Sequence, residues 1–451
     1  MPQHSKPAQS RDAMLAQLRQ THSRIKTVKD FSTQTKEVSA PKNYDFKQHP
    51  AYTDVRIAKA AGDTLSIRSP FFRVIEDFRS TEVKIDGRWV ANFASYDYLS
   101  LNLSEEIRSA VSDTVGTFGV SATASRLVGG ERSLHTELEA RLASFVGTEA
   151  TLAFVSGHAT NLAIVTTLVG PGDLVLVDAL AHNSIYEGIR ASGAKHLTFP
   201  HNDHAWVDRH LETARADFDN VLIVVEGLYS MDGDAPDLER FVAAKRRHGT
   251  WLMVDEAHSL GVLGATGRGL CEEQGVSPSD VDVIMGTLSK SFCSCGGFVA
   301  GSEALIDLMR YRAPGFVYSV GLSMPNTAAA LAAVDTIDRH PEHVAQLRDV
   351  CRTFHSVANS LGLDTGPSQS FAVCPIIIGN SLKAVWAGNR LLDAGYNVLP
   401  IIAPAVPDRS ARLRFFINRD HTEETIRAVL EETKRLLDEV ATMSITDMAA
   451  E

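Results

Sequence analysis

Lys290 stands where a buried strand is expected to end, directly after the apolar run VDVIM and the residues GTLS. Removal of a lysine from water lowers its pKa, because the ammonium form is poorly solvated there. A neutral lysine amine can form a Schiff base with a carbonyl compound. Many lysines at strand ends simply reach solvent, so Lys290 alone indicates this chemistry only weakly.

Asp255 ends a second apolar run, WLMV, and is followed by Glu256, Ala257 and His258. A carboxylate at such a point can bind a metal, act as a base, or hold a proton on a heterocyclic nitrogen. The neighbours in this local turn do not complete a coordination shell, so we predict no metal site. A carboxylate that faces a pyridinium nitrogen keeps the ring protonated and makes it a better electron sink.

Two further signals precede these residues in the chain. Gly157 and His158 open an expected helix after the run TLAFVS, and a helix start offers free backbone N–H groups to a phosphate. His182 follows the run DLVLVDAL, where an imidazole can stack on a flat ring or serve as a structural histidine. Together, a phosphate cradle, a stacking imidazole, a ring-facing carboxylate and a Schiff-base lysine indicate pyridoxal 5′-phosphate.

The elements that must position these residues alternate along the chain. From about residue 105, short and nearly continuous apolar runs are separated by helix-length segments, which predicts an α/β fold with a mostly parallel sheet buried on both faces. Ligands of such sheets gather at the carboxyl ends of the strands, where Glu226 also lies. We predict an N-terminal arm and small segment at 1–104, a large domain at 105–339 and a smaller C-terminal α/β domain at 340–451.

The composition narrows the class of protein. The chain has 451 residues, is 44% hydrophobic and carries a net charge of −11, which disfavours nucleic-acid binding because that relies on Lys and Arg. The sequence has no apolar run of membrane-spanning length, and its N-terminus lacks the apolar core of a signal peptide. Five scattered cysteines without paired spacing predict a reduced, cytoplasmic protein.

The chain resembles the α-oxoamine synthases, a family of pyridoxal 5′-phosphate enzymes of fold type I. The resemblance covers about residues 90–440 and rests on SRLVGGERSLHTELEA, SGHATN, VVEGLYSMDGD, MVDEAHSLGVLGATGRG and GTLSKSF. It implies a large domain with a mostly parallel sheet and a smaller C-terminal domain. It also implies that Lys290 forms the Schiff base and moves protons, that Asp255 pairs with the pyridine nitrogen, and that His182 stacks over the ring.

The resemblance implies roles for further residues. His258 and Ser230 would reach the region of the ring's phenolic oxygen. Arg414 would clamp the amino-acid carboxylate through a two-pronged contact, although an interdomain ion pair is the other interpretation. The phosphate would be held by groups from both subunits of a homodimer: Gly157, His158, Thr287 and, across the interface, Ser319.

The implied reaction is a decarboxylative condensation of a small amino acid with an acyl thioester, which gives an α-amino ketone, carbon dioxide and a free thiol. The family often has a glycine-rich turn where this chain reads GVSATASR, and Ser125 stands where glycine-using aminolevulinate synthases tend to carry threonine. We therefore expect a slightly roomier pocket, for serine or alanine as well as glycine.

The acyl donor is expected to be a medium- or long-chain thioester of coenzyme A or of an acyl-carrier protein. Residues 1–50 have an excess of basic side chains. We expect them to form either a partly ordered arm or dimer-wrapping extension, or a docking surface for an acidic carrier domain or a membrane surface. A fold type I aminotransferase, which would form a keto acid without a thioester, is the alternative function.

Overall fold

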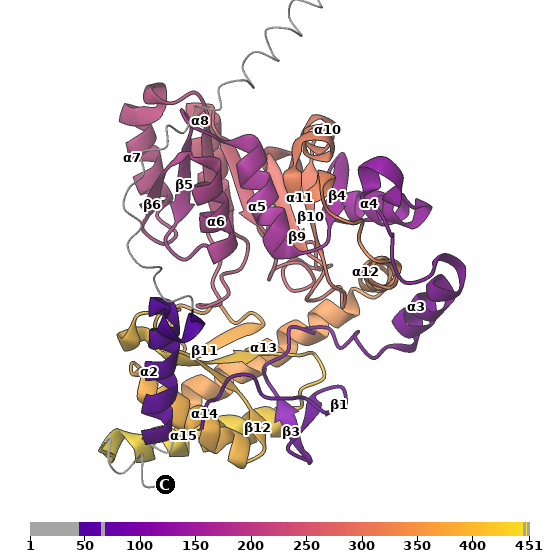
Figure 1. The fold of residues 1–451 in the computed structure, drawn as a ribbon. Helices are drawn as coiled ribbons and strands as arrows, with labels where there is room; N and C mark the ends of the chain where they lie inside the picture. The colour runs from indigo at the N-terminus through magenta and orange to yellow at the C-terminus, as the bar shows by residue number, and fades with distance from the viewer. Residues whose placement is uncertain (1–44, 65–67, 445–447, 449–451) are drawn as a thin grey trace, which may run out of the picture. The chain divides into compact units, whose positions relative to one another are not determined.

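The apolar runs form a seven-stranded sheet whose strand order is β4-β10-β9-β8-β7-β5-β6 (Figure 1). The computed structural model describes residues 45–64, 68–444 and 448. The strands are β4 (Ala150–Phe154), β5 (Leu174–Asp178), β6 (Lys195–Phe199), β7 (Val221–Glu226), β8 (Trp251–Asp255), β9 (Val283–Thr287) and β10 (Gly297–Gly301). The pairs among β5 to β9 are parallel, which confirms the predicted α/β fold.

Alternate residues of each strand pack against opposite layers of helices. In β7, Leu222 and Val224 join one apolar cluster, whereas Ile223 and Val225 join the other. The first layer contains α5 (Gly157–Leu168), α6 (Asn183–Ser192), α10 (Glu303–Arg312) and α11 (Pro314–Val317). The second contains α4 (Ser133–Val146), α7 (His204–Ala214), α8 (Leu238–His248) and α12 (Met324–Arg339). Burial on both faces explains why the strand sequences are almost continuously apolar.

Two strands depart from the simple pattern. β10 is antiparallel to both β9 and β4, because only the loop 288–296 separates it from β9, which is too short for a parallel crossover. β6 was not among the predicted strands. It lies at the sheet edge, and four of its five residues are exposed, so it lacks an apolar run.

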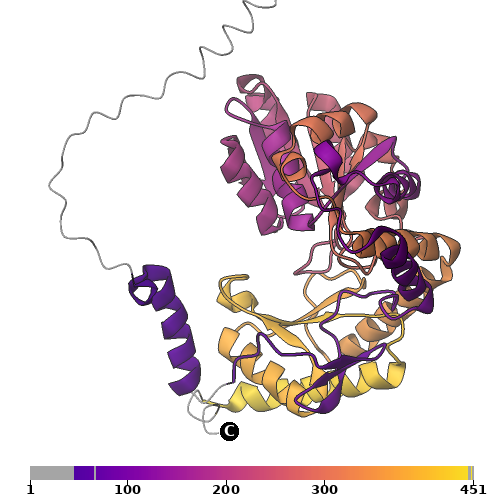
Figure 2. The ribbon, with the colours of Figure 1, turned by 45° about the vertical axis from the view of Figure 1, so that its right-hand side comes forward.

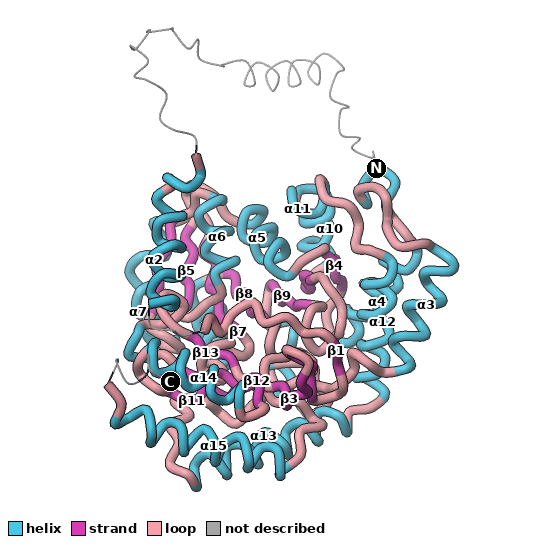
Figure 3. The backbone as a smooth tube through the Cα atoms, turned by 60° about the horizontal axis from the view of Figure 1, so that its bottom comes forward, coloured by secondary structure: helices cyan, strands magenta, loops and turns pink. Residues whose placement is uncertain are grey.

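The C-terminal portion carries a three-stranded antiparallel sheet of β11 (Val373–Ile377), β14 (Arg412–Phe416) and β13 (Leu399–Ile401). Its helices are α13 (Glu342–Ser360), α14 (Ser381–Asp393) and α15 (Glu423–Thr442), and α13 and α15 lie side by side (Figure 3). The orange segment that holds α12 and α13 links this portion to the large sheet (Figure 2).

A four-stranded sheet joins residues that are far apart in the sequence. β1 (Asp77–Phe78), β2 (Glu82–Ile85) and β3 (Arg88–Asn92) pair in order, and β3 then pairs with β12 (Tyr396–Asn397). Part of the predicted segment 1–104 therefore shares a sheet with the predicted C-terminal domain. The domain bounds themselves stay a prediction.

The chain divides into two units, Met1–Ala61 and Gly62–Glu451. The described part of the first contains η1 (Phe46–Gln48) and most of α2 (Pro50–Thr64), whereas residues 1–44 of the predicted basic arm lie outside the described residues. The remaining α-helices are α3 (Glu105–Phe118) and α9 (Leu270–Gln274). None of the helices in the described part of the chain is long and apolar enough to cross a membrane. All five cysteines are free.

Candidate active site

A cavity of about 360 Å³ opens at the carboxyl ends of the parallel strands. It collects side chains from the ends of β7, β8 and β9, from the first turn of α5, from the residues around the start of α6, and from β14. The predicted site residues that line it are Gly157, His158, His182, Ser230, Asp255, His258, Thr287, Lys290 and Arg414. The fold therefore brings residues separated by more than 250 positions into one hollow.

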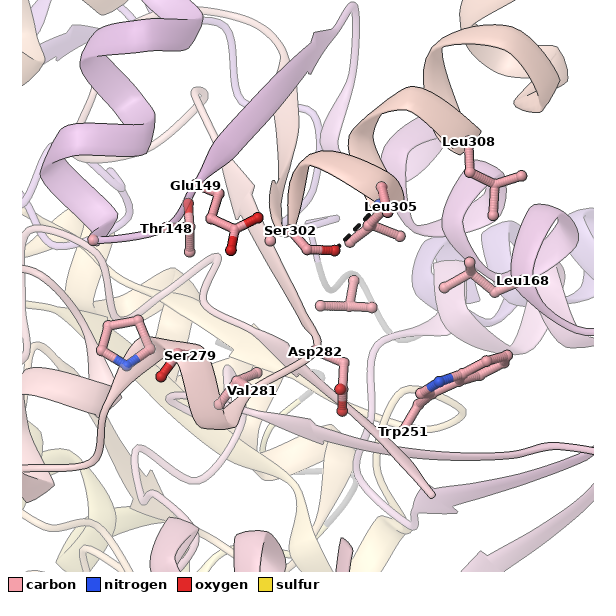
Figure 4. Close-up of a pocket in the computed structure, with 15 residues that line it drawn as sticks. Thr148, Glu149, Leu168, Trp251, Ser279, Val281, Asp282, Ser302, Leu305 and Leu308 are labelled. Atoms are coloured by element: carbon pink, nitrogen blue, oxygen red, sulfur yellow. Dashed lines mark hydrogen bonds between the residues drawn. The ribbon is translucent and has the colours of Figure 1, made fainter. Parts of the chain in front are cut away.

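A second cavity, of about 470 Å³, lies at the amino ends of the parallel strands of the same sheet (Figure 4). Trp251 and Val283, which line it, are the first residues of β8 and β9. The carboxylate of Asp282 there forms an ion pair with Nζ of Lys245 at 2.8 Å. None of the predicted site residues lines this cavity, so the candidate active site is the cavity at the carboxyl ends of the strands.

Lys290 follows β9 and reaches into the 360 Å³ cavity, where its Nζ lies 5.7 Å from the ring centroid of Tyr96. Burial lowers the pKa of Lys290 to about 8, although the carboxyl group of Asp255 acts in the opposite direction. A substantial fraction of this amine is consequently neutral near pH 8, which a lysine needs to attack a carbonyl group.

Asp255 is held in place by two hydrogen bonds to its carboxylate. Its Oδ2 accepts from Nδ2 of Asn161 at 2.7 Å and its Oδ1 from the backbone N–H of Ala257 at 3.0 Å. The Asn161 amide also donates to Oγ of Ser184 at 2.9 Å. The two donors hold the carboxyl group of Asp255 in one orientation, and Asp255 is only 3% exposed. Asn161 had no predicted role, but its position one helical turn after Gly157 was the available signal.

The start of α5 lies against Thr287, and only a glycine fits there. A Cβ atom on Gly157 would come within 2.9 Å of Oγ1 of Thr287 and within 3.3 Å of the methyl carbon of Met285. Ser156 caps the helix through Oγ, which accepts from the N–H of Ala159. The first N–H groups of a helix have no carbonyl partner within it, so this close junction could hold a phosphate group.

Two histidines of the cavity are held in defined orientations. The Nδ1 of His182 shares a hydrogen bond of 2.7 Å with Oγ of Ser184, and burial lowers the pKa of this imidazole. The Nδ1 of His258 shares a hydrogen bond of 2.7 Å with the hydroxyl group of Tyr98, and burial lowers its pKa well below the usual value. Both rings are therefore neutral at physiological pH. Tyr98 had no predicted role, because this contact spans 160 positions.

Arg414 enters the cavity from β14, with its Cζ 4.6 Å from the ring centroid of Phe416. Its Nη1 donates to the backbone oxygen of Ser230 at 2.9 Å and lies 3.4 Å from the sulfur of Met231. Among the described residues its Nε has no hydrogen-bond partner, although it is buried. The guanidinium group is thus fixed while one donor stays available for an anion.

The loop that carries Ser230 and Met231 is fastened to the large sheet by His201. The Nδ1 of His201 lies 2.9 Å from Oδ1 of Asp178, and its Nε2 lies 2.9 Å from Oδ2 of Asp234. Burial alone would lower the pKa of His201, but these hydrogen bonds raise it to about 10. The charged imidazolium therefore bridges β5 and the loop. No role was predicted for His201.

Ser125 and Ser319 do not line the 360 Å³ cavity of a single chain. Oγ of Ser125 donates to the backbone oxygen of Val317 at 2.7 Å, and Ser125 forms an isolated backbone bridge with Val320. These two segments therefore lie side by side. Next to Ser319, Tyr318 is 87% exposed, so this surface presents a large apolar side chain to the outside.

The residues of the cavity fit pyridoxal 5′-phosphate. A buried carboxylate with two donors suits a protonated ring nitrogen, the α5 junction suits a phosphate, and the partly neutral lysine suits an aldehyde. Glu226 also lines the cavity, and its Oε1 is buried without a hydrogen-bond partner among the described residues. An unsatisfied buried oxygen of this kind is expected where a ligand completes the site.

Comparisons with known proteins agree with this geometry. The sequence model of the family described as aminotransferase class I and II matches residues 89–432. The 8-amino-7-oxononanoate synthase of Maricaulis maris is 40% identical over 356 residues, which cover 79% of this chain and 88% of the relative. The serine palmitoyltransferase of Sphingobacterium spiritivorum is 35% identical over 376 residues, 83% of this chain and 93% of the relative.

A solved structure, described as SPT with its PLP internal aldimine, superposes with a TM-score of 0.83 and 28% sequence identity. The superposition covers 89% of this chain and 100% of the solved one. The chain belongs to the aminotransferase class I and II family and, within it, to the α-oxoamine synthases, which are pyridoxal 5′-phosphate-dependent acyltransferases that condense an amino acid with an acyl thioester.

Proposed function

We propose that this protein condenses serine, alanine or glycine with a medium- or long-chain acyl thioester. A carbon–carbon bond forms between the amino acid's α-carbon and the acyl carbonyl carbon, the thiol leaves, and the carboxyl group is lost as carbon dioxide. The observation that carries this proposal is the convergence of Lys290, Asp255, His182 and Arg414 on one cavity. When bound, pyridoxal 5′-phosphate supplies an electron sink for the negative charge that develops at the α-carbon.

Lys290 is the proposed proton carrier. Its Nζ, with a pKa of about 8, can take the α-proton of the amino acid as a neutral amine and return a proton at the end of the reaction. Asp255 would hold a proton on the ring nitrogen of the bound cofactor, while His182, as a neutral imidazole, would stack on the ring face. His258 and Ser230 serve the phenolic oxygen region.

Arg414 is proposed to bind the carboxylate of the amino acid. Its fixed Nη1 and unpartnered Nε support this role, because a guanidinium group held in one orientation positions an anion without a further loss of entropy. The phosphate is proposed to lie at the α5 junction against the backbone of Gly157 and His158 and the hydroxyl group of Thr287.

A neighbouring cavity of about 340 Å³ supports an apolar acyl donor. It shares Tyr96, Ser289 and Lys290 with the first cavity and is also lined by Ile75 and Phe78. These two apolar side chains are about 40% and 48% exposed, so they offer surface to an acyl chain. An acyl group placed there would meet the amino acid next to Nζ of Lys290.

The proposal includes a homodimer. Tyr318, Val128 and Val120 are 87%, 79% and 65% exposed, and exposed apolar side chains around paired segments are typical of interfaces. A second subunit packed on this surface would bring Ser319 to the phosphate of the neighbouring site and Ser125 to its amino-acid pocket. The donor thiol, coenzyme A or a carrier protein docked by the arm at 1–50, is part of the same proposal.

The test is thiol release from a panel of acyl-coenzyme A donors, and from the matching carrier-bound donors, with serine, alanine or glycine added separately. We expect release that depends on one amino acid and favours medium or long chains, and none from Lys290→Ala. Keto-acid formation without a thioester would instead support the aminotransferase alternative. Unchanged turnover of carrier-bound donors after deletion of residues 1–50 would exclude the docking role.

A further inference from the structure

Glu226 carries a buried carboxyl group in the 360 Å³ cavity, and the reaction proposed above assigns it no role. It is the last residue of β7, is 3% exposed, and lines the 360 Å³ cavity. Its Oε1 has no hydrogen-bond partner among the described residues. Buried polar atoms are nearly always satisfied in folded proteins, so an unpartnered buried oxygen on a side chain that lines a cavity points to a ligand.

The position of Glu226 pairs it with Asp255. The two residues are direct neighbours in the parallel ladder of β7 and β8, so their side chains emerge on the same face at the same sheet edge. Two carboxyl groups at the distance of adjacent strands repel each other when both are ionised, and one of them then keeps its proton.

The hydrogen bonds identify which of the two is ionised. Asp255 accepts from Asn161 and from the backbone of Ala257, and donors of this kind stabilise a carboxylate. Glu226 accepts from the backbone N–H of His182, but its Oε1 has no donor among the described residues. Because it has fewer donors than Asp255, Glu226 is the one of the two that keeps the proton.

The charges around Glu226 act in the same sense. Burial, Asp255 on β8 and Asp178 on β5 together raise the pKa of Glu226 well above its usual value. Lys290 after β9 and the backbone N–H of His182 before α6 oppose this shift but do not reverse it. A protonated carboxyl group is a hydrogen-bond donor, which an ionised one is not.

We propose that Glu226 is a cofactor-positioning residue, whose protonated carboxyl group donates a hydrogen bond to the phenolic oxygen of the bound ring. This inference rests on the proposed function, because it requires the ring nitrogen to lie against Asp255. The phenolic oxygen is attached two ring atoms from that nitrogen, so a donor on the strand next to Asp255 can reach it when the ring turns its phenolic side toward β7. Together the two carboxyl groups would fix the rotation of the ring in its plane while adding a single negative charge.

Two variants of the full-length protein separate the donor from the charge. Glu226→Gln keeps the shape and a hydrogen-bond donor but cannot ionise, whereas Glu226→Leu removes the donor. Apoprotein of each is titrated with pyridoxal 5′-phosphate, followed by absorbance. We expect the dissociation constant to change less than about threefold in Glu226→Gln and to rise about tenfold or more in Glu226→Leu.

Infrared difference spectra of the native holoprotein against Glu226→Gln test the protonation directly. We expect the native protein to show an additional carbonyl band of a protonated carboxyl group at about pH 8.5, where ordinary carboxyl groups are ionised. Glu256, whose pKa burial raises to about 7, contributes little at that pH. This measurement decides the inference even where Glu226→Leu does not fold.

Asp255→Asn is the control for the site itself. If Asp255→Asn binds the cofactor as tightly as the native protein does, the proposed placement of the ring is wrong and the proposed function must be revised. If Asp255→Asn weakens binding but the native protein lacks the extra infrared band, or Glu226→Leu binds normally, then only the inference about Glu226 is overturned.

Discussion

Asn161→Ala is the substitution that we expect to reveal how far the site depends on a residue outside the reaction. Asn161 is 2% exposed, and its amide joins α5 to the carboxylate of Asp255 at 2.7 Å and to Ser184 at 2.9 Å. A hydrogen bond to a charged group contributes about 1.5–3 kcal/mol and a neutral one about 0.5–1.5 kcal/mol. Loss of both predicts that the free energy of unfolding of the apoprotein falls by about 2–4 kcal/mol.

The cofactor should report the same change. Without Asn161 the carboxylate of Asp255 keeps only the backbone N–H of Ala257 among the donors described above, so it is less firmly held toward the ring nitrogen. We expect the dissociation constant of pyridoxal 5′-phosphate to rise about tenfold, corresponding to about 1.4 kcal/mol. Urea denaturation of the apoprotein and titration with cofactor measure the two quantities separately.

Asn183→Ala is the matched control, because Asn183 is exposed at the start of α6 and its side chain, among the residues that the structure describes, reaches only Glu187, at 3.5 Å. A surface change of this kind should alter the free energy of unfolding by less than about 0.5 kcal/mol. Asn161→Asp should be worse than Asn161→Ala, since it places a second carboxylate against Asp255. If Asn161→Ala unfolds and binds cofactor as the control does, the assigned role of the amide in holding Asp255 is wrong.

Three further predictions concern pH and a buried contact. The pKa of Lys290 falls from 10.5 to about 8 on folding, so the unfolded chain binds more protons between these values and the stability of the apoprotein should rise with pH across that window. Urea midpoints of Lys290→Met should rise less steeply with pH than those of the native protein, and equal slopes would contradict the lowered pKa of Lys290. The pKa of His201 is raised from 6.5 to about 10, so its contribution to the free energy of unfolding is complete below pH 6.5 and is lost as the pH rises through 10. His201→Gln should therefore be most destabilising at acidic pH, and a loss of stability that does not change with pH would count against a charged imidazolium. Tyr98→Phe removes the 2.7 Å bond to His258 and should cost about 1 kcal/mol of unfolding free energy, measured by the same denaturation; no loss would mean that the hydroxyl group is not needed there.

The strands that were predicted from the sequence are those whose burial on both faces makes their own residues apolar. β5, β7 and β9 are buried at every position, so their residues are apolar one after another. β6 lies at the edge of the sheet, and four of its five residues are exposed. Its sequence KHLTF therefore looks no different from that of a polar connecting segment. Pairing of β12 with β3 was equally hidden, because it depends on a contact across about 300 positions.

The site residues divide in the same way. Asp255 directly follows an apolar run and Lys290 follows one within a few residues, so position along the chain was enough to single them out. Glu226 was visible for the same reason but had no assigned role. Asn161 and Tyr98 act through contacts 94 and 160 positions away. Their hydrogen-bond partners could be found only after the fold had placed them together.

The loop that carries Ser230 and Met231 lies between the large sheet and Arg414, the proposed carboxylate-binding residue. On one side His201 joins Asp234 of this loop to β5. On the other, Arg412 binds Asp232 and the backbone oxygen of Met231, while Arg414 binds the backbone oxygen of Ser230. Because the loop is fastened from both sides, the distance between the clamp and Lys290 is set by hydrogen bonds of the chain itself. A substitution that loosens His201 should therefore raise the KM for the amino acid before it alters the binding of the cofactor.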